Sequence, residues 1–298
     1  MRIPATQTMK FDFESKFFST NKTLNISGRL LNLDFHKIMG ILNVTSDSFY
    51  DGNRYTSEAT IVKQVEKMVF EGADIIDVGA YSTRPGADEV SVAEEIKRSV
   101  EAIRIIRKKF PNTLISIDTF RSEVVRATVQ EGACIVNDIS GGELDQKMFS
   151  TVAQLKIPYI LMHMRGNPKT MTAQTEYSNI LKDLMDYFHK KVSQLHQLGI
   201  KDIIIDPGFG FAKTAQQGFD LLNHLEHFKI LNKPLLVGLS RKSMIWKTLQ
   251  SKPEDALNGT TSLNTIALLK GASFLRVHDV REAREAIKLV SSLKGIAS

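Results

Sequence analysis

The stretch Lys37-Ile-Met-Gly-Ile-Leu-Asn43 sets the pattern that decides the fold, because it is a short apolar run that stops at a polar side chain. Seven further runs of this kind follow along the chain. They are 74–76 before Asp77, 114–117 before Asp118, 134–136 before Asn137, 159–161 before Met162 and His163, 203–205 before Asp206, 235–239 before Ser240, and 274–275 before Arg276. Short runs rich in Ile, Val and Leu are typical of strands buried on both faces.

Stretches with helical periodicity separate these runs. One begins with Ser91-Val-Ala-Glu94, the pattern of a capping box, and another ends at Gly199, a typical helix C-cap. Strands that alternate with helices predict a parallel sheet, and eight such units predict a closed (β/α)8 TIM barrel. The chain has 298 residues, which suits one barrel of ~250 residues with an extension. Active sites of such barrels lie at the C-terminal strand ends, so we expect the polar residues there to share one pocket.

Composition narrows the class of protein. No run reaches the ~18 apolar residues of a membrane helix, and the first nine residues have no apolar signal core. A single cysteine, Cys134, excludes an internal disulfide framework and favours a cytoplasmic protein. The net charge of +6 comes from basic residues interleaved with acids along the predicted helices. We therefore expect neither nucleic-acid nor membrane binding, and an anionic small-molecule substrate instead.

The chain reads as an extension over residues 1–36 followed by one barrel over 37–298, with no repeat or linker that divides it. The first twenty residues are expected to be partly mobile. Residues 24–35 alternate loosely in polarity and contain Ser27-Gly28, which predicts a hairpin that plugs or edges the barrel. Segments 44–56 and 79–91 are long for strand-to-helix connections, and we expect them to close over a substrate.

The strand ends combine hydrogen-bond acceptors with cations. The acceptors are Asp77, Asp118, Asn137 and Asp206, and the cations are Arg241, Lys242, Arg276 and His278, with Arg84 on the second long loop. A matching ligand carries a flat, donor-rich ring at one end and an anion such as phosphate at the other. The Asp206 carboxylate could accept two parallel N–H groups of the ring, and Arg276 with His278 could hold phosphate oxygens.

Each of these residues also has a structural interpretation. An aspartate at a strand end often caps the next helix or binds loop amides, and Asp77, with Gly79 close by, is the one most expected to be structural. His163 lies between two methionines and is interpreted as structural, and Met162 as a pocket wall. Since no histidine cluster accompanies the carboxylates, a metal cage built by the protein alone is not expected. The glycines of 208–214 do not have the spacing of a nucleotide phosphate loop.

Taken together, these segments resemble the dihydropteroate synthase family of folate biosynthesis, the target of sulfonamides. The resemblance covers nearly all of residues 37–298, and its motifs occur in order at the strand ends. They are Ile38-Met-Gly-Ile-Leu-Asn-Val-Thr-Ser-Asp-Ser-Phe49, Asp74-Ile-Ile-Asp-Val-Gly79 with Ser82-Thr-Arg-Pro-Gly-Ala87, Ile117-Asp-Thr-Phe120, Val136-Asn-Asp-Ile-Ser-Gly141, Met162-His-Met164, Asp206-Pro-Gly-Phe-Gly-Phe211, Ser240-Arg-Lys-Ser243 and Arg276-Val-His278.

The resemblance implies a reaction that joins 6-hydroxymethyl-7,8-dihydropterin diphosphate to 4-aminobenzoate in a homodimeric enzyme that uses Mg2+. The implied pterin ligands are Asp118, Asn137, Met162, Asp206, Phe211, Lys242 and Arg276. The implied diphosphate ligands are Asn43, Arg276 and His278, with Asn43 also contacting Mg2+. The implied aminobenzoate ligands are Phe49, Thr83, Arg84, Pro85 and Ser243. The implied catalytic residues are Asp51, Arg84, Asp118, Asp206, Lys242 and Arg276.

Two positions depart from the family pattern. Ser46 stands where the family usually has proline, and Ala80-Tyr81 stands where many members have Gly-Glu. Neither change touches the implied pterin ligands, so they bear on the affinity for aminobenzoate and on the response to sulfonamides. Two alternatives share the pterin carboxylates. One is a methyltransferase that moves a methyl group from methyltetrahydrofolate to a corrinoid protein, and the other is a non-catalytic paralogue that binds pterin or a partner.

Overall fold

A computed structural model describes residues 23–44, 54–81 and 90–295, and for residues 54–57 it describes the backbone only. Its main sheet has eight parallel strands in the order β8-β7-β6-β5-β4-β3-β10-β9. They are β3 (Lys37–Asn43), β4 (Ile75–Gly79), β5 (Leu114–Asp118), β6 (Ile135–Asp138), β7 (Tyr159–Met162), β8 (Ile203–Asp206), β9 (Leu236–Val237) and β10 (Phe274–Val277). A parallel bridge between Ile205 and Leu235 joins the two ends of this order, so the predicted barrel is confirmed.

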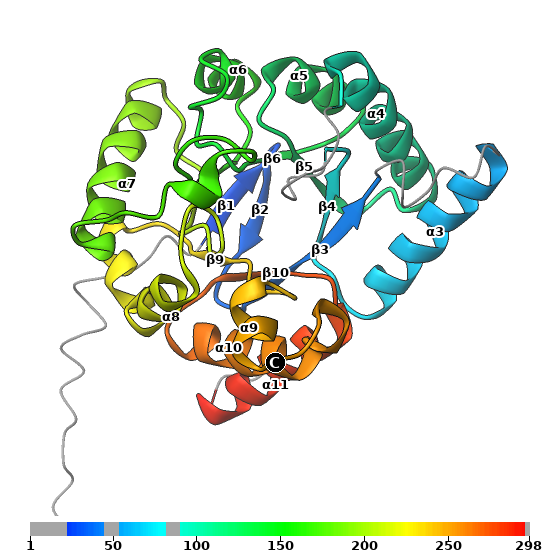
Figure 1. The fold of residues 1–298 in the computed structure, drawn as a ribbon. Coiled ribbons are helices and arrows are strands. Elements are labelled where there is room, and N and C mark those ends of the chain that lie inside the picture. The colour runs from blue at the N-terminus through cyan, green and yellow to red at the C-terminus, as the bar shows by residue number, and fades with distance from the viewer. Residues whose placement is uncertain (1–22, 45–53, 82–89, 296–298) are drawn as a thin grey trace, which may run out of the picture.

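Helices form an outer ring around the strands (Figure 1). They are α3 (Arg54–Phe70), α4 (Val92–Lys109), α5 (Ser122–Gln130), α6 (Met148–Leu155), α7 (Ile180–Gln197), α8 (Ala215–Asn223), α9 (Ser243–Thr248), α10 (Leu257–Leu269) and α11 (Val280–Leu293). Three short 3-10 helices are η1 (Met171–Ala173), η2 (Leu225–Leu231) and η3 (Pro253–Asp255). Within the described ranges, no helix combines the length and apolar character needed to cross a membrane.

The helix ends follow the sequence in part. Ser91 Oγ accepts a hydrogen bond from the Glu94 N–H (3.2 Å), as a capping box requires. The Glu94 carboxylate, however, accepts from Arg98 Nε (2.8 Å), so the structure forms the Ser91 half of the predicted box. Gly199 follows α7 with φ of +83°, a left-handed conformation that glycine adopts without strain and that ends a helix.

The predicted hairpin is confirmed, and it plugs the barrel. Strands β1 (Thr23–Ile26) and β2 (Arg29–Asn32) pair antiparallel around Ser27-Gly28, whose φ angles of +51° and +89° suit a tight hairpin turn. The hairpin lies at the barrel centre in Figure 1. Its Leu24 and Ile26 pack into the interior layer that Met39, Ile75, Cys134, Ile135, Ile160, Ile204, Leu236 and Phe274 form. The first twenty residues, predicted to be partly mobile, lie outside the described residues.

Several strands differ from the predicted bounds, and among them β6 and β10 run past Asn137 and Arg276 to Asp138 and Val277. β4 runs on to Gly79, so Asp77 lies inside the strand instead of following it. β9 is shorter than the predicted run, and Leu235, just before it, forms the bridge that closes the barrel. Since side chains alternate along a strand, Asp77 faces the barrel interior together with Ile75. This placement gives Asp77 a central position in the site.

Candidate active site

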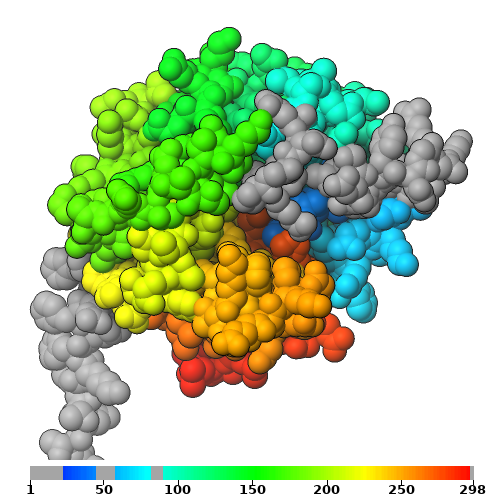
Figure 2. Space-filling view, viewed as in Figure 1, coloured from blue at the N-terminus to red at the C-terminus, as the bar shows by residue number. Residues whose placement is uncertain are grey.

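The polar strand-end residues gather at one end of the barrel. Asp118, Asn137, Asp206 and Arg276 lie in the C-terminal parts of β5, β6, β8 and β10. Lys242 directly precedes α9. The face drawn in Figure 2 is hollowed near its centre, where orange-red and blue atoms of strand regions lie below the surrounding elements. The structure therefore brings together residues from four strands and one helix start, as the sequence predicted.

Arg276 is the centre of an ion network inside this end of the barrel. Its Nε donates to Asp77 Oδ2 (2.7 Å) and its Nη2 donates to Asp118 Oδ2 (2.5 Å). Asn137 Nδ2 also donates to Asp77 Oδ2 (3.0 Å). Asp77 is fully buried, and its Oδ1 has no hydrogen-bond partner within the described part of the chain. Asp77 thus has a structural role, which it fulfils by orienting two predicted site residues, Arg276 and Asn137, and not by capping a helix.

Burial and charge set the protonation of this network. Burial raises the pKa of Asp118 to about 7, and the neighbouring Asp77 adds to the rise while Arg276 opposes it. Burial alone would lower the pKa of Arg276, but Asp77 and Asp118 raise it above its ordinary value. Arg276 therefore stays charged, and Asp118 is the group in this network that titrates near neutral pH.

The free energy of unfolding is expected to fall as pH rises from about 4 to 7, because the pKa of Asp118 is about 7 in the folded state and ~3.9 in the unfolded state. A carboxyl group with a raised folded-state pKa contributes its full stability below pH ~4 and loses it through pH ~7. Asp118→Asn should remove roughly 1–3 kcal/mol of this fall. Urea unfolding from pH 4.5 to 8 measures the effect, and parallel curves for both proteins would contradict it.

Asp206 and Lys242 lie beside the turn between β8 and α8. Asp206 is 6% exposed, and its Oδ1 accepts from the Gly208 N–H (2.8 Å). Lys242 Nζ lies 4.5 Å from the centre of the Phe211 ring and donates to the Phe209 carbonyl. Burial raises the pKa of Asp206 and lowers that of Lys242 to about 8. A carboxylate, an ammonium and an aromatic face thus share one small volume, as the predicted ring site requires.

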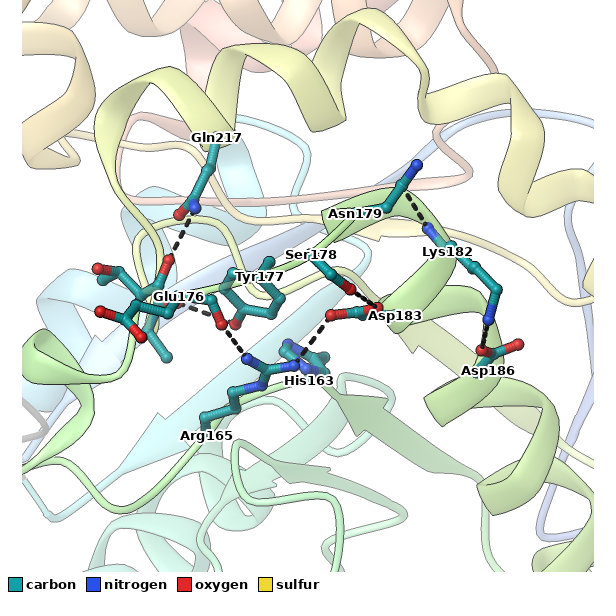
Figure 3. Close-up of polar contacts among 12 residues, drawn as sticks. His163, Arg165, Glu176, Tyr177, Ser178, Asn179, Lys182, Asp183, Asp186 and Gln217 are labelled. Carbon is teal, nitrogen blue, oxygen red and sulfur yellow. Dashed lines mark hydrogen bonds and ion pairs between the residues drawn. The ribbon is translucent and has the colours of Figure 1, made fainter.

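The end of β7 supplies an apolar wall. Met162 is buried in a cluster with Ile139, Met164, Met171 and Ala212, against which Phe120 and Phe211 pack. His163 is also buried, and its ring meets Tyr187 edge to face with 4.8 Å between the centroids. The structural interpretation of His163 is therefore supported, and Figure 3 shows His163 with Tyr177, another of its aromatic neighbours.

The residues predicted to bind diphosphate lie around the ends of β3 and β10. Asn43 is exposed at the end of β3, and His278 follows β10. Ser240 Oγ lies 3.0 Å from His278 Nδ1 and accepts from the His278 N–H (3.2 Å), which ties β9 to β10. Arg241, expected among the pocket cations, instead donates to both carboxylate oxygens of Asp279 (3.0 and 2.7 Å).

Ser243 is exposed in the first turn of α9, close in sequence to Lys242. The other residues predicted to bind aminobenzoate, Phe49, Thr83, Arg84 and Pro85, lie outside the described residues, as do the predicted catalytic Asp51 and the departure at Ser46. The structure gives no placement for these six side chains.

Tyr81, one of the two departures from the family pattern, packs against an aromatic ring and a cation. The Tyr81 ring meets the Phe120 ring edge to face (5.2 Å), and the Arg121 guanidinium lies 5.2 Å from the Tyr81 centroid. Arg121 also donates to the buried Glu95 carboxylate (2.7 Å), which accepts from Thr119 Oγ1 as well (2.5 Å). Burial raises the pKa of Glu95. An aromatic ring at position 81 therefore packs on a cation whose charge another carboxylate already balances.

Sequence reasoning named Asp77 among the strand-end acceptors but missed its contacts with Arg276 and Asn137, and it missed Lys213 altogether. Strand alternation places Asp77 and Gly79 on one face of β4, but it does not identify Arg276 as the partner of Asp77. Lys213 gave no signal, because a lysine after a glycine-rich turn is usually solvated. In the structure it is 8% exposed, and its Nζ contacts both His163, just after β7, and the β8–α8 turn.

Three comparisons place the chain among known proteins. Residues 39–278 match the family model described as pterin binding enzyme. The dihydropteroate synthase of Synechocystis is 44% identical over 259 residues, which are 86% of this chain and 89% of that protein. The Yersinia pestis dihydropteroate synthase, solved in complex with a sulfonamide drug, is 35% identical with a TM-score of 0.85, covering 92% of this chain and 99% of that one. The Xanthomonas albilineans dihydropteroate synthase, solved with 4-aminobenzoic acid, has the same identity and TM-score and covers 93% and 99%.

Proposed function

The chain belongs to the dihydropteroate synthase family of pterin-binding enzymes, and on this basis we propose that it condenses 6-hydroxymethyl-7,8-dihydropterin diphosphate with 4-aminobenzoate. The products are 7,8-dihydropteroate and diphosphate. The observation that carries the proposal is the convergence of Asp118, Asn137, Asp206, Lys242 and Arg276 at one end of the barrel. These are the residues that match the family's pterin motifs, and they provide hydrogen-bond acceptors on one side and cations on the other.

The pterin ring is proposed to bind between the acceptors and the apolar wall. The Asp206 carboxylate accepts ring N–H groups, and Asn137, oriented by Asp77, offers amide groups to the ring. Met162 and Phe211 flank the ring faces, and both belong to one apolar cluster. Burial of these groups makes each hydrogen bond to the ring more selective, since a wrong ligand leaves a buried group unpaired.

The reaction is proposed to proceed by departure of diphosphate followed by attack of the aromatic amine. Arg276 and His278 take up charge on the leaving diphosphate, and Asp118 with Asp206 stabilises the positive charge left on the pterin methylene. An aromatic amine is a competent nucleophile without a strong base. The roles of Asp51 and Arg84 remain part of the proposal through the family motifs.

Mg2+ is proposed as the cofactor, held largely by the substrate. Within the described ranges there is no group of three His, Cys, Asp or Glu that could hold a metal. The exposed Asn43 carries a neutral amide oxygen, a hard ligand of the kind that Mg2+ accepts beside phosphate oxygens and water. When bound, Mg2+ would neutralise charge on the diphosphate.

The alternatives have less support. The relatives and solved structures named above are dihydropteroate synthases, which supports the condensation over methyl transfer. A non-catalytic paralogue would be favoured by lost site residues, whereas Asn43, Lys242, Arg276 and His278 are all present.

Diphosphate release from the pterin substrate is the experiment that tests the proposed function. Release that depends on 4-aminobenzoate, with dihydropteroate formed in equal amount, is the expected result. Excess chelator should lower the rate at least tenfold, since Mg2+ offsets the leaving-group charge, and added Mg2+ should restore it. Pterin binding without diphosphate release would identify the non-catalytic paralogue, and methyl transfer from methyltetrahydrofolate would identify the other alternative.

Binding of 4-aminobenzoate is expected to depend on diphosphate and Mg2+. Asn43, assigned to diphosphate, directly precedes the segment that carries Phe49 and Asp51, so one short piece of chain serves both sites. Positive coupling between sites is typically about 1–3 kcal/mol. Calorimetric titration with 4-aminobenzoate should therefore give a signal only after diphosphate and Mg2+ are added. Equal affinity with and without them would contradict the coupling.

The proposal also includes an oligomeric state and a cellular location. A homodimer is proposed through α10 and α11, whose outward Ile266, Leu269, Leu289 and Leu293 are 39–75% exposed. Leu263 of α10 packs partly against the core, so the outward face of α10 lies elsewhere on the helix. A cytoplasmic location is proposed because the single cysteine, Cys134, is a free buried thiol.

A further inference from the structure

The turn between β8 and α8 is held by side chains that donate to its carbonyl groups. This Phe211 turn (residues 207–212) contains Gly208, Gly210 and Ala212 with φ of +71°, +76° and +49°. The Gly208 and Phe211 carbonyls accept from Lys213 Nζ (3.0 and 2.9 Å), and the Phe209 carbonyl accepts from Lys242. The Ala212 carbonyl accepts from the Tyr177 hydroxyl (2.9 Å). Side-chain donors therefore fix a backbone path that bends repeatedly into the left-handed region.

Lys213 also connects this turn to the neighbouring strand end. Its Nζ lies 3.0 Å from His163 Nδ1 and 3.2 Å from the His163 carbonyl, just after β7. Lys213 Nζ thus contacts three carbonyl oxygens and one ring nitrogen, two of these four atoms from each strand end, and the residue is 8% exposed. Burial lowers the pKa of Lys213 well below its ordinary value. A buried lysine is destabilising unless its N–H groups are paired, so these contacts account for its position.

Tyr177 reaches the same turn from the β7–α7 connection. Figure 3 shows Arg165 between Tyr177, Glu176 and Asp183. The Arg165 guanidinium lies 3.8 Å from the Tyr177 ring centroid, donates to the Glu176 carbonyl, and donates to Asp183 Oδ2 (3.2 Å). Arg165 therefore holds the Tyr177 ring in the position from which its hydroxyl donates to the Ala212 carbonyl. Lys213 and Tyr177 thus hold the same turn through separate hydrogen bonds.

We propose that Lys213, supported by Tyr177, is a positioning residue for the pterin site that acts through Phe211. By holding the Phe211 turn against the end of β7, Lys213 sets the spacing between Phe211 and Met162, the two walls assigned to the ring. The inference rests on the proposed function. Lys242 is itself assigned to the ring, so its hydrogen bond to Phe209 is shared or given up when pterin binds. Lys213 and Tyr177 then hold the turn in the loaded site.

The first test compares two buried lysines. Lys233 is 6% exposed and donates to the Lys201 carbonyl (3.4 Å) just before β9, at the opposite end of the barrel. Lys213→Met should weaken binding of 6-hydroxymethylpterin about 10- to 100-fold by calorimetry, the range expected when buried carbonyls lose their donor. Lys233→Met should leave it within threefold. KM for the pterin diphosphate should rise in Lys213→Met with kcat little changed, because ground-state and transition-state binding are lost together.

A double-mutant cycle separates positioning from a general loss of structure. If Lys213 acts through Phe211, then Lys213→Met should change pterin affinity less than threefold in a Phe211→Ala background. Tyr177→Phe, which keeps the ring on Arg165, should weaken binding by a smaller factor in the same direction. An unchanged Kd in Lys213→Met, or an equal loss in both backgrounds, would overturn the inference. Failure of the unaltered chain to bind 6-hydroxymethylpterin would overturn the proposed function, and this inference with it.

Discussion

Arg276→Met is expected to lower the free energy of unfolding by about 3–5 kcal/mol at pH 7.5 and to reduce turnover at least a thousandfold. The guanidinium is the counter-charge of Asp77, which is fully buried, and of Asp118, whose side chain is 17% exposed. Methionine fills a similar volume but leaves both carboxylates without a cation. It also removes the group proposed to take up charge on the departing diphosphate. Urea unfolding and a diphosphate-release assay measure the two effects.

Arg241→Met is the matched control for this substitution. Arg241 also makes a two-point ion pair, with Asp279, but its side chain is 33% exposed and outside the network of Arg276. Partly exposed pairs contribute ~1 kcal/mol or less. A loss below 1 kcal/mol for Arg276→Met, or equal losses in the two variants, would show that Arg276 is not the required counter-charge. Lowering the pH to 5 should reduce the Arg276→Met penalty, because protonation of Asp118, whose pKa is already about 7, removes one unpaired charge.

Asp206→Ala is expected to weaken pterin binding about a hundredfold or more while the fold is retained. One oxygen of this carboxylate accepts from the Gly208 N–H, and the carboxylate is 6% exposed. Two charge-assisted hydrogen bonds to a ring contribute about 1.5–3 kcal/mol each, and about 1.4 kcal/mol corresponds to a tenfold change in affinity. Calorimetry with 6-hydroxymethylpterin measures the loss directly.

The control for Asp206→Ala lies at the other end of the same strand. Asp202 directly precedes β8 and accepts from the Asn25 N–H (2.8 Å) of the hairpin. Asp202→Ala should leave pterin affinity within threefold and affect mainly stability. Similar affinities for the unaltered chain and Asp206→Ala would remove Asp206 from the pterin site, and a circular dichroism spectrum that changes on substitution would assign the loss to the fold.

The barrel could be predicted from the sequence because strands buried on both faces are apolar along their whole length. The positions of Asp118, Asn137 and Asp206 at strand ends followed directly from this pattern. The role of Asp77 did not, since its partner Arg276 lies 199 residues away and no local pattern links the two. The same holds for Arg241, whose pairing with Asp279 removed it from the expected pocket cations. Periodicity thus predicts the scaffold, whereas long-range ion pairing decides which charged residues serve the site.

The hairpin below the barrel bears on the order in which the chain can fold during synthesis. Its residues are synthesised before those of the barrel strands, yet Leu24 and Ile26 have their apolar partners on strands as late as β8 and β10, and Asn25 hydrogen-bonds to Asp202. Contacts between such distant residues form late and slow folding. In a nascent chain, the apolar side chains of the hairpin therefore lack their packing partners until the last strands leave the ribosome. Only then can the hairpin cover the barrel floor, and a shortened chain would present that floor to chaperones and proteases.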